Sequence, residues 1–335
     1  MRRIIATAAL AVAGLWLSAA ASPAAERVSF TPGWFFYGRD VGFFASIEKG
    51  YYTREGIDFI IEPGKGAADA MNRVAGKRNR FAVAGNGAVV ITRSKGVPVK
   101  VISMYHDKPL DVIYTLKGSG ITKPKDLEGK KLGASPKDAA AMLFPALAKT
   151  NKIETEKVNW IYMNPTSKIP SLLAGRVDAI VIFHNSYPAA TAAAAKSGKE
   201  IVPLLYADWG LDIYSAGIIA LEEDLKQNGD LVRRFLKATY EGTAWAIDHP
   251  DEAVKLFLKH NTSLNPKMVK GEWLITAEHL LTPLARKNGL GYMDRNKMER
   301  TIQVVADSMG EKPVPVDEFY TSRFLPKIFP ESAKR

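Results

Sequence analysis

The feature that most constrains the fold of this chain is a repeated alternation of short β-rich runs, glycine-containing loops and helical stretches. In the first block we predict helices at 43–51, 67–75 and 88–95, between strands at 28–30, 57–61, 81–84 and 99–104. This order is typical of a mostly parallel α/β sheet, whose ligand-binding loops follow the C-terminal ends of the strands.

A second block repeats the alternation and is followed by a helical segment. Its helices are predicted at 139–150, 169–174 and 189–196, and its strands at 112–116, 132–134, 158–162, 177–183, 201–205 and 215–220. Beyond Glu222 the pattern is helical, over 224–248, 250–260, 266–287 and 294–309. The sequence therefore predicts two α/β lobes, crossed twice by the chain, and a helical C-terminal segment.

The expected division follows from this pattern. Residues 25–115 plus 217–335 are assigned to lobe 1 and residues 116–216 to lobe 2, with hinges near 115–117 and 214–217. A chain of about 310 residues after removal of a leader exceeds one comfortable core, which also favours two domains.

The N-terminus predicts export. Residues 1–24 read as a signal peptide, with a short positive start, an apolar run over 4–21 and small residues before a cleavage site near Ala24. The alternative, a membrane anchor, is disfavoured because the run is near the lower length limit for spanning and no positive cluster follows it. The expected location is the periplasm.

Composition excludes several chemistries. The chain has no cysteine, so disulfides, thiolate metal sites, a cysteine nucleophile and a lipid anchor on an N-terminal cysteine are ruled out. The formal charge of +11 becomes 11 − 2 = +9 when Arg2 and Arg3 are removed. Because the lysines are scattered, we interpret this charge as a solvated surface and expect no nucleic-acid partner.

No motif indicates catalysis or a bound cofactor. Gly64-Lys65-Gly66 lacks the remaining residues of a dinucleotide or phosphate loop. The five histidines form no metal-binding pair, and no G-x-S-x-G nucleophile turn occurs. We therefore predict no metal, no cofactor and no enzymatic activity.

Polar and aromatic residues instead follow the predicted strands, the composition of a small-molecule cleft. They lie in "GASPKDAAAM", "FHNSYP" and "ADWGLDIYS". In the first of these, Ser135 could bind a ligand or could equally cap a helix. An aromatic cluster, Trp34 to Tyr37, follows the first strand and could belong to a core or to a ligand site. The three quoted stretches supply the ligand-binding candidates Ser135, Asn185, Tyr187, Asp208 and Tyr214.

Several spaced motifs resemble one family. They are the stretch 50–102, from "GYYTREGIDFII" to "GVPVKVI", then "GSGITKPKDLEGKKLGAS", "NPTSKIPSLLAGRVDAI" and "YADWGLDIYSAGIIA". Together they resemble periplasmic substrate-binding proteins of ABC transporters, of the thiamine-pyrimidine-precursor, nitrate, sulfonate and taurine type. The similarity runs from Val28 to about Leu221, and the last motif is most similar to the pyrimidine-precursor branch.

The resemblance implies a type II-like, two-lobed clamp that closes on a solute and delivers it to an inner-membrane ABC permease. It implies a monomer whose ligand is a small planar nitrogenous or aromatic molecule. In this family the loop after the first strand faces the cleft, so Trp34 and Tyr37 would stack on a planar ligand. Loop position supplies the other candidates: Arg39 is the cation of the first loop, and Asn86, Asn164 and Asn185 are expected to hydrogen-bond the ligand.

Departures from the family leave alternatives open. Pyrimidine-binding members carry an acidic residue where this chain has His184-Asn185-Ser186. A sulfonate, nitrate or taurine receptor would depend on Arg39, and a sensor would bind the same ligand but signal to another partner. An enzyme would need an acid–base pair, for which Asp208 with His184 is the candidate. The yeast pyrimidine synthases of this fold carry a cysteine-rich motif, which this chain lacks.

Overall fold

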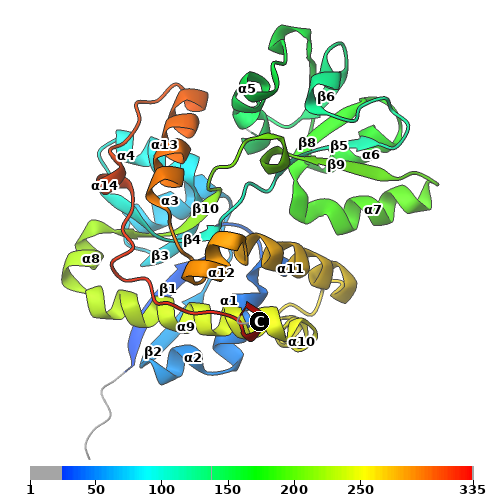
Figure 1. The fold of residues 1–335 in the computed structure, drawn as a ribbon. Helices are drawn as coiled ribbons and strands as arrows, with labels where there is room; N and C mark the ends of the chain where they lie inside the picture. Colours follow the sequence, from blue (N-terminus) through cyan, green and yellow to red (C-terminus); the bar gives the residue numbers. More distant parts are fainter. Residues whose placement is uncertain (1–24, 137, 334–335) are drawn as a thin grey trace, which may run out of the picture.

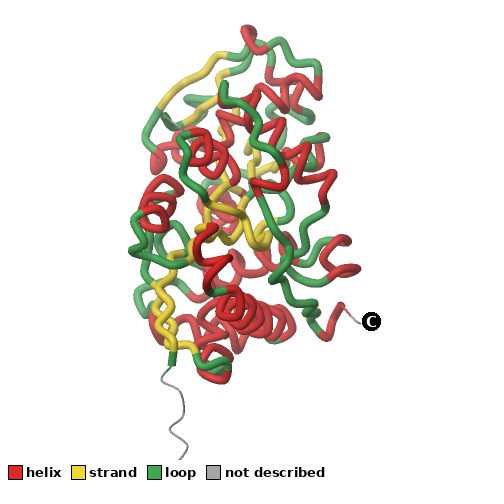
Figure 2. The backbone as a smooth tube through the Cα atoms, turned by 90° about the vertical axis from the view of Figure 1, so that its left-hand side faces the viewer, coloured by secondary structure: helices red, strands yellow, loops and turns green. Residues whose placement is uncertain are grey.

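The structure, a computed structural model, describes residues 25–136 and 138–333, and the predicted signal peptide lies outside this part. The described chain forms two lobes, each built on one five-stranded sheet (Figure 1). Figure 2 shows the molecule turned by 90°, with helices around the strands of both lobes. None of the described helices is both long and apolar enough to cross a membrane.

The first sheet has the order β2-β1-β3-β10-β4. β1, β2 and β3 are parallel, and β10 runs antiparallel to β3 and β4. Its strands are β1 (Glu26–Thr31), β2 (Ile57–Ile61), β3 (Phe81–Gly85), β4 (Val99–His106) and β10 (Ala216–Leu221).

Both faces of this sheet are covered by helices, because successive side chains along its buried strands point to opposite faces. One face packs against α1 (Val41–Glu48), α9 (Gly229–Asp248), α10 (Pro250–His260) and α11 (Pro266–Leu280). The other packs against α3 (Ala67–Ala75), α4 (Asn86–Ser94), α13 (Arg295–Met309) and α14 (Val316–Phe319). The remaining lobe-1 elements are α2 (Tyr51–Arg54), α8 (Glu222–Gln227), α12 (Pro283–Asn288), η1 (Gly38–Asp40) and η7 (Glu331–Ala333).

The second sheet has the order β7-β6-β8-β5-β9. Its strands are β5 (Asp111–Leu116), β6 (Lys131–Ala134), β7 (Asn159–Tyr162), β8 (Ala179–Phe183) and β9 (Ile201–Leu205). α5 (Ala139–Asn151) covers one face, and α6 (Lys168–Leu173) and α7 (Tyr187–Lys196) cover the other. Short 3-10 helices complete the lobe: η2 (Pro124–Leu127), η3 (Thr155–Lys157), η4 (Pro165–Ser167), η5 (His184–Ser186) and η6 (Tyr206–Trp209).

The predicted alternation and the two crossings are present, but the first boundary was misplaced. β5 pairs with β8 and β9, so it belongs to the second sheet, and the first crossing is 107–110 rather than 115–117. The alternation places this strand in the second block, as observed, whereas the predicted boundary at 115 cuts through it. The second crossing, 206–215, overlaps the predicted hinge at 214–217, and hinge motion there stays a prediction.

The C-terminal helices are shorter than predicted. The segment predicted as 224–248 breaks at Asn228 between α8 and α9, and the segment 266–287 breaks before Pro283 between α11 and α12. Pro283 has no N–H to donate to an α-helix and stands at the first position of α12, which accounts for the second break.

The strand directions bring two edges of the sheets face to face. β1 to β4 end at one edge of the first sheet, where β10 begins, and β6 to β9 end at one edge of the second, where β5 begins. Because the crossings join β4 to β5 and β9 to β10, these two edges must face each other; we call them the facing edges. The strands that the crossings join, β4 with β5 and β9 with β10, are the crossing strands, and they lie on one side of each sheet, which we call the crossing end. β1 and β7 lie towards the opposite side, which we call the open end.

Candidate functional site

The aromatic loop after β1 divides between surface and core. Trp34 and Phe35 are 46% and 60% exposed, with their rings in edge contact at 5.3 Å. The Trp34 ring also covers Gly66, where a Cβ would lie 2.8 Å from the ring, so a side chain there would displace it. Phe36 turns inward, with its ring 5.2 Å from that of Phe44. The first two aromatics are therefore available to a ligand.

The next residues of the loop are held by internal partners. The Arg39 guanidinium lies 4.7 Å from the centre of the Tyr37 ring, and its Nε donates to Asp40 Oδ1 at 3.3 Å. A terminal nitrogen of Arg39 donates to the carbonyl of Pro32. Burial raises the pKa of Asp40 to about 7, although the nearby Arg39 opposes the shift. Arg39 thus organises this loop and is only 12% exposed.

Tyr37 also reaches the other lobe. Burial raises the pKa of its phenol, and a side-chain hydrogen bond with Asn185 of η5 opposes that shift. Nearby, a Cβ on Gly271 of α11 would lie 2.7 Å from Pro188 Cγ of α7. The two lobes therefore touch at Tyr37–Asn185 and at Gly271–Pro188.

His184 occupies the lobe-2 side of this contact. Its Nδ1 lies 3.3 Å from the Tyr114 hydroxyl, and its ring lies 5.0 Å from that of Tyr187 and 6.4 Å from that of His279. Burial lowers the pKa of His184 to about 4, so the ring is neutral at pH 7. Among the interactions of the described residues, none joins His184 to the exposed Asp208, the proposed acid–base partner.

Four buried side-chain atoms in the described chain lack a hydrogen-bond partner, and all four belong to residues at the facing edges. Their residues begin, end or directly follow strands of the two sheets and are at most 6% exposed. Such atoms are rare because an unmade hydrogen bond costs about 1–3 kcal/mol. The atoms are Asn86 Oδ1 and His106 Nε2 from lobe 1, and Asp111 Oδ1 and Ser135 Oγ from lobe 2.

Both titratable members of this set are shifted towards the neutral form. Burial raises the pKa of Asp111 to about 7, and the neighbouring Asp138 carboxylate raises it further. Burial lowers the pKa of His106 well below its ordinary value, and the positive charges of Arg39 and of a protonated His279 act in the same direction. Both effects follow from removing an ionised group from water without an opposite charge beside it.

The lobe-2 cation nearest this set is already paired. Lys168 is 5% exposed, and its Nζ contacts Asp138 Oδ2 at 2.5 Å and donates to the carbonyl of Val181 at 2.9 Å. The Ser135 N–H lies 3.4 Å from the same Asp138 oxygen. Asp138, which directly precedes α5, and Lys168 therefore compensate each other's charge.

The other predicted site residues have different positions. Tyr187 is half-buried against His184, and Asn164 is exposed after the edge strand β7. The prediction that Tyr214 contacts the ligand is wrong. Its side chain is 1% exposed, its hydroxyl accepts from the Asp294 N–H at 2.7 Å, and Lys297 lies 4.7 Å from its ring centre. It therefore anchors the second crossing to α13 and is not available to a ligand.

A buried lysine ties both crossings to α13. Lys297 Nζ lies 3.1 Å from Asp107 Oδ1 in the first crossing and 2.8 Å from Asp212 Oδ1 in the second. It also donates to the Asp107 carbonyl at 2.8 Å, while the other Asp107 oxygen accepts from Thr282. This cluster fixes the segments that any movement of the lobes must bend.

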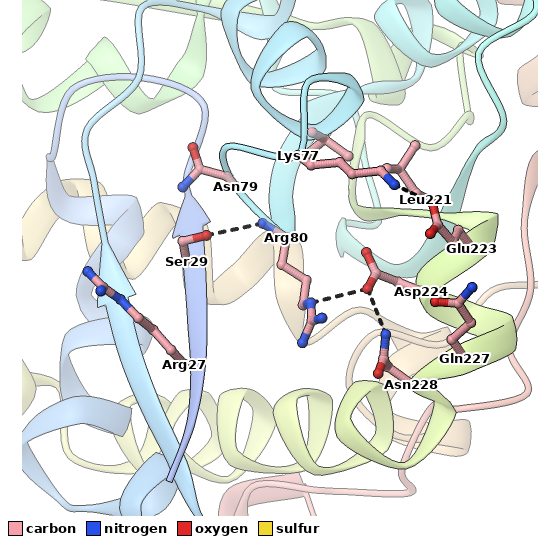
Figure 3. Close-up of a pocket in the computed structure, with 11 residues that line it drawn as sticks. Arg27, Ser29, Lys77, Asn79, Arg80, Leu221, Glu223, Asp224, Gln227 and Asn228 are labelled. Atoms are coloured by element: carbon pink, nitrogen blue, oxygen red, sulfur yellow. Dashed lines mark hydrogen bonds and ion pairs between the residues drawn. The ribbon is translucent and has the colours of Figure 1, made fainter. Parts of the chain in front are cut away.

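Two cavities are lined by none of the predicted site residues. One of about 310 Å³ is at the opposite edge of the first sheet, where Lys77–Glu223 and Arg80–Asp224 form ion pairs at 2.5 and 3.1 Å (Figure 3). The other, of about 550 Å³, lies between α5, α13 and the second crossing. In the described residues no group of three or more histidines and carboxylates could hold a metal ion.

Two lobes, each with its own sheet, and two crossings define the fold of periplasmic binding proteins. A solved structure with this fold is the aliphatic sulphonate binding protein SsuA from Escherichia coli. It aligns with a TM-score of 0.70 and 15% identity, over 89% of this chain and 92% of that one.

The chain belongs to the family described as NMT1/THI5 like, whose model matches residues 40–253. A formylaminopyrimidine-binding protein of Halalkalibacterium halodurans is 23% identical over 305 residues, covering 89% of this chain and 91% of that protein. The riboflavin-binding protein RibY of Chloroflexus aurantiacus is 25% identical over 295 residues, 85% of this chain and 82% of its own. A 4-amino-5-hydroxymethyl-2-methylpyrimidine phosphate synthase of Legionella pneumophila is 23% identical over 303 residues, 90% and 93% of the two chains.

Proposed function

We propose that this protein is an exported solute receptor of an ABC importer, which binds a small planar nitrogenous or aromatic molecule between its lobes. The observation that carries the proposal is the position of the large hydrophobic side chains that remain exposed. In the described chain all but one lie in loops or strand ends at the facing edges, and the last lies on α11, which contacts both η5 and α7 of lobe 2. They are Trp34, Phe35, Ile161, Tyr162, Phe183 and Leu274.

These side chains come from both lobes. Trp34 and Phe35 follow β1 and Tyr162 ends β7, which places them towards the open end, whereas Phe183 ends the central strand β8. Exposed apolar groups gathered at one place mark a binding surface, and a planar ligand between aromatic rings gains about 0.5–1.5 kcal/mol beyond area burial. Both relatives named for binding are named for planar nitrogen heterocycles.

The proposed mechanism is closure of the lobes about the two crossings. A ligand that contacts both facing edges binds the closed state more tightly than the open one, and so shifts the population towards it. The permease would then recognise the closed state. Export to the periplasm and the absence of catalysis are part of this proposal.

The test is a thermal-shift screen of the mature protein, followed by calorimetry and small-angle scattering. The compounds are 4-amino-2-methylpyrimidine, riboflavin, methanesulfonate, taurine and nitrate. A compound present at 100 times its dissociation constant should add about 2.7 kcal/mol of stability. We expect a planar heterocycle to raise the melting temperature and to reduce the radius of gyration.

The variant Trp34→Leu should weaken that binding about tenfold, because it loses a stacking surface. Trp245→Leu is the matched control, since Trp245 lies on α9 against His249 and Lys49, away from the facing edges. A response to sulfonate, taurine or nitrate alone would keep the receptor and overturn the ligand class. The receptor itself is overturned if no compound binds or compacts the protein, or if a bound compound is converted into a product.

A further inference from the structure

We infer that the four unpartnered polar groups at the facing edges form one subsite that recognises a neutral or cationic group bearing several N–H donors, and that this subsite rejects anions. The inference rests on the proposed function and specifies its ligand. It assigns ligand-binding roles to His106 and Asp111, and it joins them to Asn86 and Ser135.

The first step is that these atoms are exceptional. In the described chain they are the only buried side-chain nitrogen and oxygen atoms without a hydrogen-bond partner. Elsewhere buried polar groups are satisfied, as in the pairs of Tyr52 with Thr239 and of Ser103 with Tyr240. Four unmade hydrogen bonds lower the stability of the unliganded protein, and a ligand that completes them would remove this penalty.

The second step is that the strand order places the four residues at the facing edges, two in each lobe. Ala216 of β10 pairs with both Gly85 and His106, so Asn86, which follows Gly85, lies about two strand spacings, roughly 10 Å, from His106. Asp111 pairs with Phe183 of β8, and β6, which Ser135 follows, is the next strand on the other side of β8. The first crossing, 107–110, directly joins His106 of the lobe-1 pair to Asp111 of the lobe-2 pair.

The third step is the chemistry of the set. Asn86 Oδ1 can only accept hydrogen bonds, and an ionised Asp111 carboxylate also only accepts. The Asn86 amide nitrogen is already engaged, because it donates to the Tyr214 carbonyl at 2.9 Å. Neutral His106 and Ser135 can donate or accept. The set therefore matches a ligand edge that offers N–H groups.

The fourth step concerns charge. Arg39 contacts Asp40 and the Pro32 carbonyl, and Lys168 contacts Asp138, so both nearby cations are compensated by the protein. An anionic ligand would instead meet Asp111, with Asp138 close behind it. An amino heterocycle or an amidine would meet complementary acceptors, and hydrogen bonds to an ionised group are the stronger kind.

The experiment compares two ligands of nearly the same shape, 4-amino-2-methylpyrimidine and 2,4-dimethylpyrimidine, in which a methyl group replaces the amino group. Their affinities are measured by calorimetry on the wild-type protein, with methanesulfonate as the anionic probe. We expect the amino compound to bind at least tenfold more tightly than the dimethyl compound, and methanesulfonate not to bind. A site built for a donor discriminates strongly against an analogue that lacks it.

The variants are Asp111→Asn and Ser135→Ala, with Asp58→Asn as the matched control because Asp58 is exposed on the edge strand β2. Asp111→Asn should reduce the preference for the amino compound to less than threefold, whereas the control should leave it unchanged. Circular dichroism and a thermal melt establish that each variant is folded, and Ser135→Ala serves if Asp111→Asn is not.

A wild-type preference below threefold, or one that both variants leave intact, would overturn the subsite. Binding of methanesulfonate, or no binding by either pyrimidine, would overturn it as well. The proposed function fails separately: it is overturned if no compound in the wider panel binds or compacts the protein, or if a bound compound is converted into a product.

Discussion

Replacing Asp111 by asparagine should make the unliganded protein more stable at high pH while weakening its ligand binding. Asp111 is 2% exposed, and its Oδ1 has no hydrogen-bond partner. Burial raises the pKa of its carboxyl from an ordinary value of 3.8 to about 7. The carboxylate is therefore poorly stabilised by the folded protein above that pH.

The sign and size of the effect follow from proton linkage. Between pH 4 and pH 7 the native state binds more protons at Asp111 than the unfolded state does, so the free energy of unfolding falls as the pH rises. The stability is complete below the unfolded pKa and is lost as the pH passes through the folded one. Raising the pKa from 3.8 to about 7, at about 1.4 kcal/mol for each tenfold change in proton affinity, amounts to about 4 kcal/mol, of which about 3 kcal/mol falls between pH 5 and pH 8.

The assay is urea unfolding of the wild-type protein, Asp111→Asn and Asp58→Asn at pH 5, 6, 7 and 8. The difference in unfolding free energy between Asp111→Asn and the wild type should grow by about 3 kcal/mol from pH 5 to pH 8. The exposed control at position 58 should follow the wild type. A difference that stays constant with pH, or that shrinks, would refute the account of Asp111 as a buried, uncompensated carboxyl.

Two further substitutions test the packing around the site. Lys297→Met should cost about 3–5 kcal/mol, because it leaves the buried Asp107 carboxylate without its cation, whereas Lys226→Met on the surface should be nearly neutral; urea unfolding measures both. Gly242→Ala should cost about 1–3 kcal/mol, because its Cβ would lie 2.0 Å from Ser46 Oγ and 2.6 Å from Ser46 Cα where α9 crosses α1. A Gly242→Ala melt equal to the wild type would show that the two helices separate easily.

The fold was largely predictable because its signal is local. Strand runs such as "IDFII" and "AIVIF" and the helices between them are set by neighbouring residues, and both observed sheets are built from them. The position of the boundary between the lobes was not predictable: the alternation placed the strand 112–116 in the second block, yet the boundary drawn at 115 cut through it. That boundary depends on pairing with β8 and β9, from residues about 65 to 95 positions later in the chain.

Members of the proposed site were predictable where position along a strand decides where a residue lies. Asn86 and Ser135 lie at the facing edges because ligand loops follow strand ends, and Trp34 is exposed as the family resemblance implied. Tyr214 was wrong because α13, some 80 residues further on, covers it. Asp111 was missed because a single acid before an apolar run looks like a strand boundary, and nothing in the sequence shows that its carboxylate has no partner.

The order of the strands separates recognition from closure. His106 and Asp111 lie on the crossing strands β4 and β5, whereas Trp34 and Tyr162 lie towards the open end. When two lobes rotate about their crossings, displacement grows with distance from the axis, so His106 and Asp111 move less than Trp34 and Tyr162. In the proposed closure, a ligand could therefore make its directional hydrogen bonds to these nearly fixed partners before the aromatic groups close over it. That order of events would account for polar atoms that are buried in the unliganded protein while the aromatic side chains remain exposed.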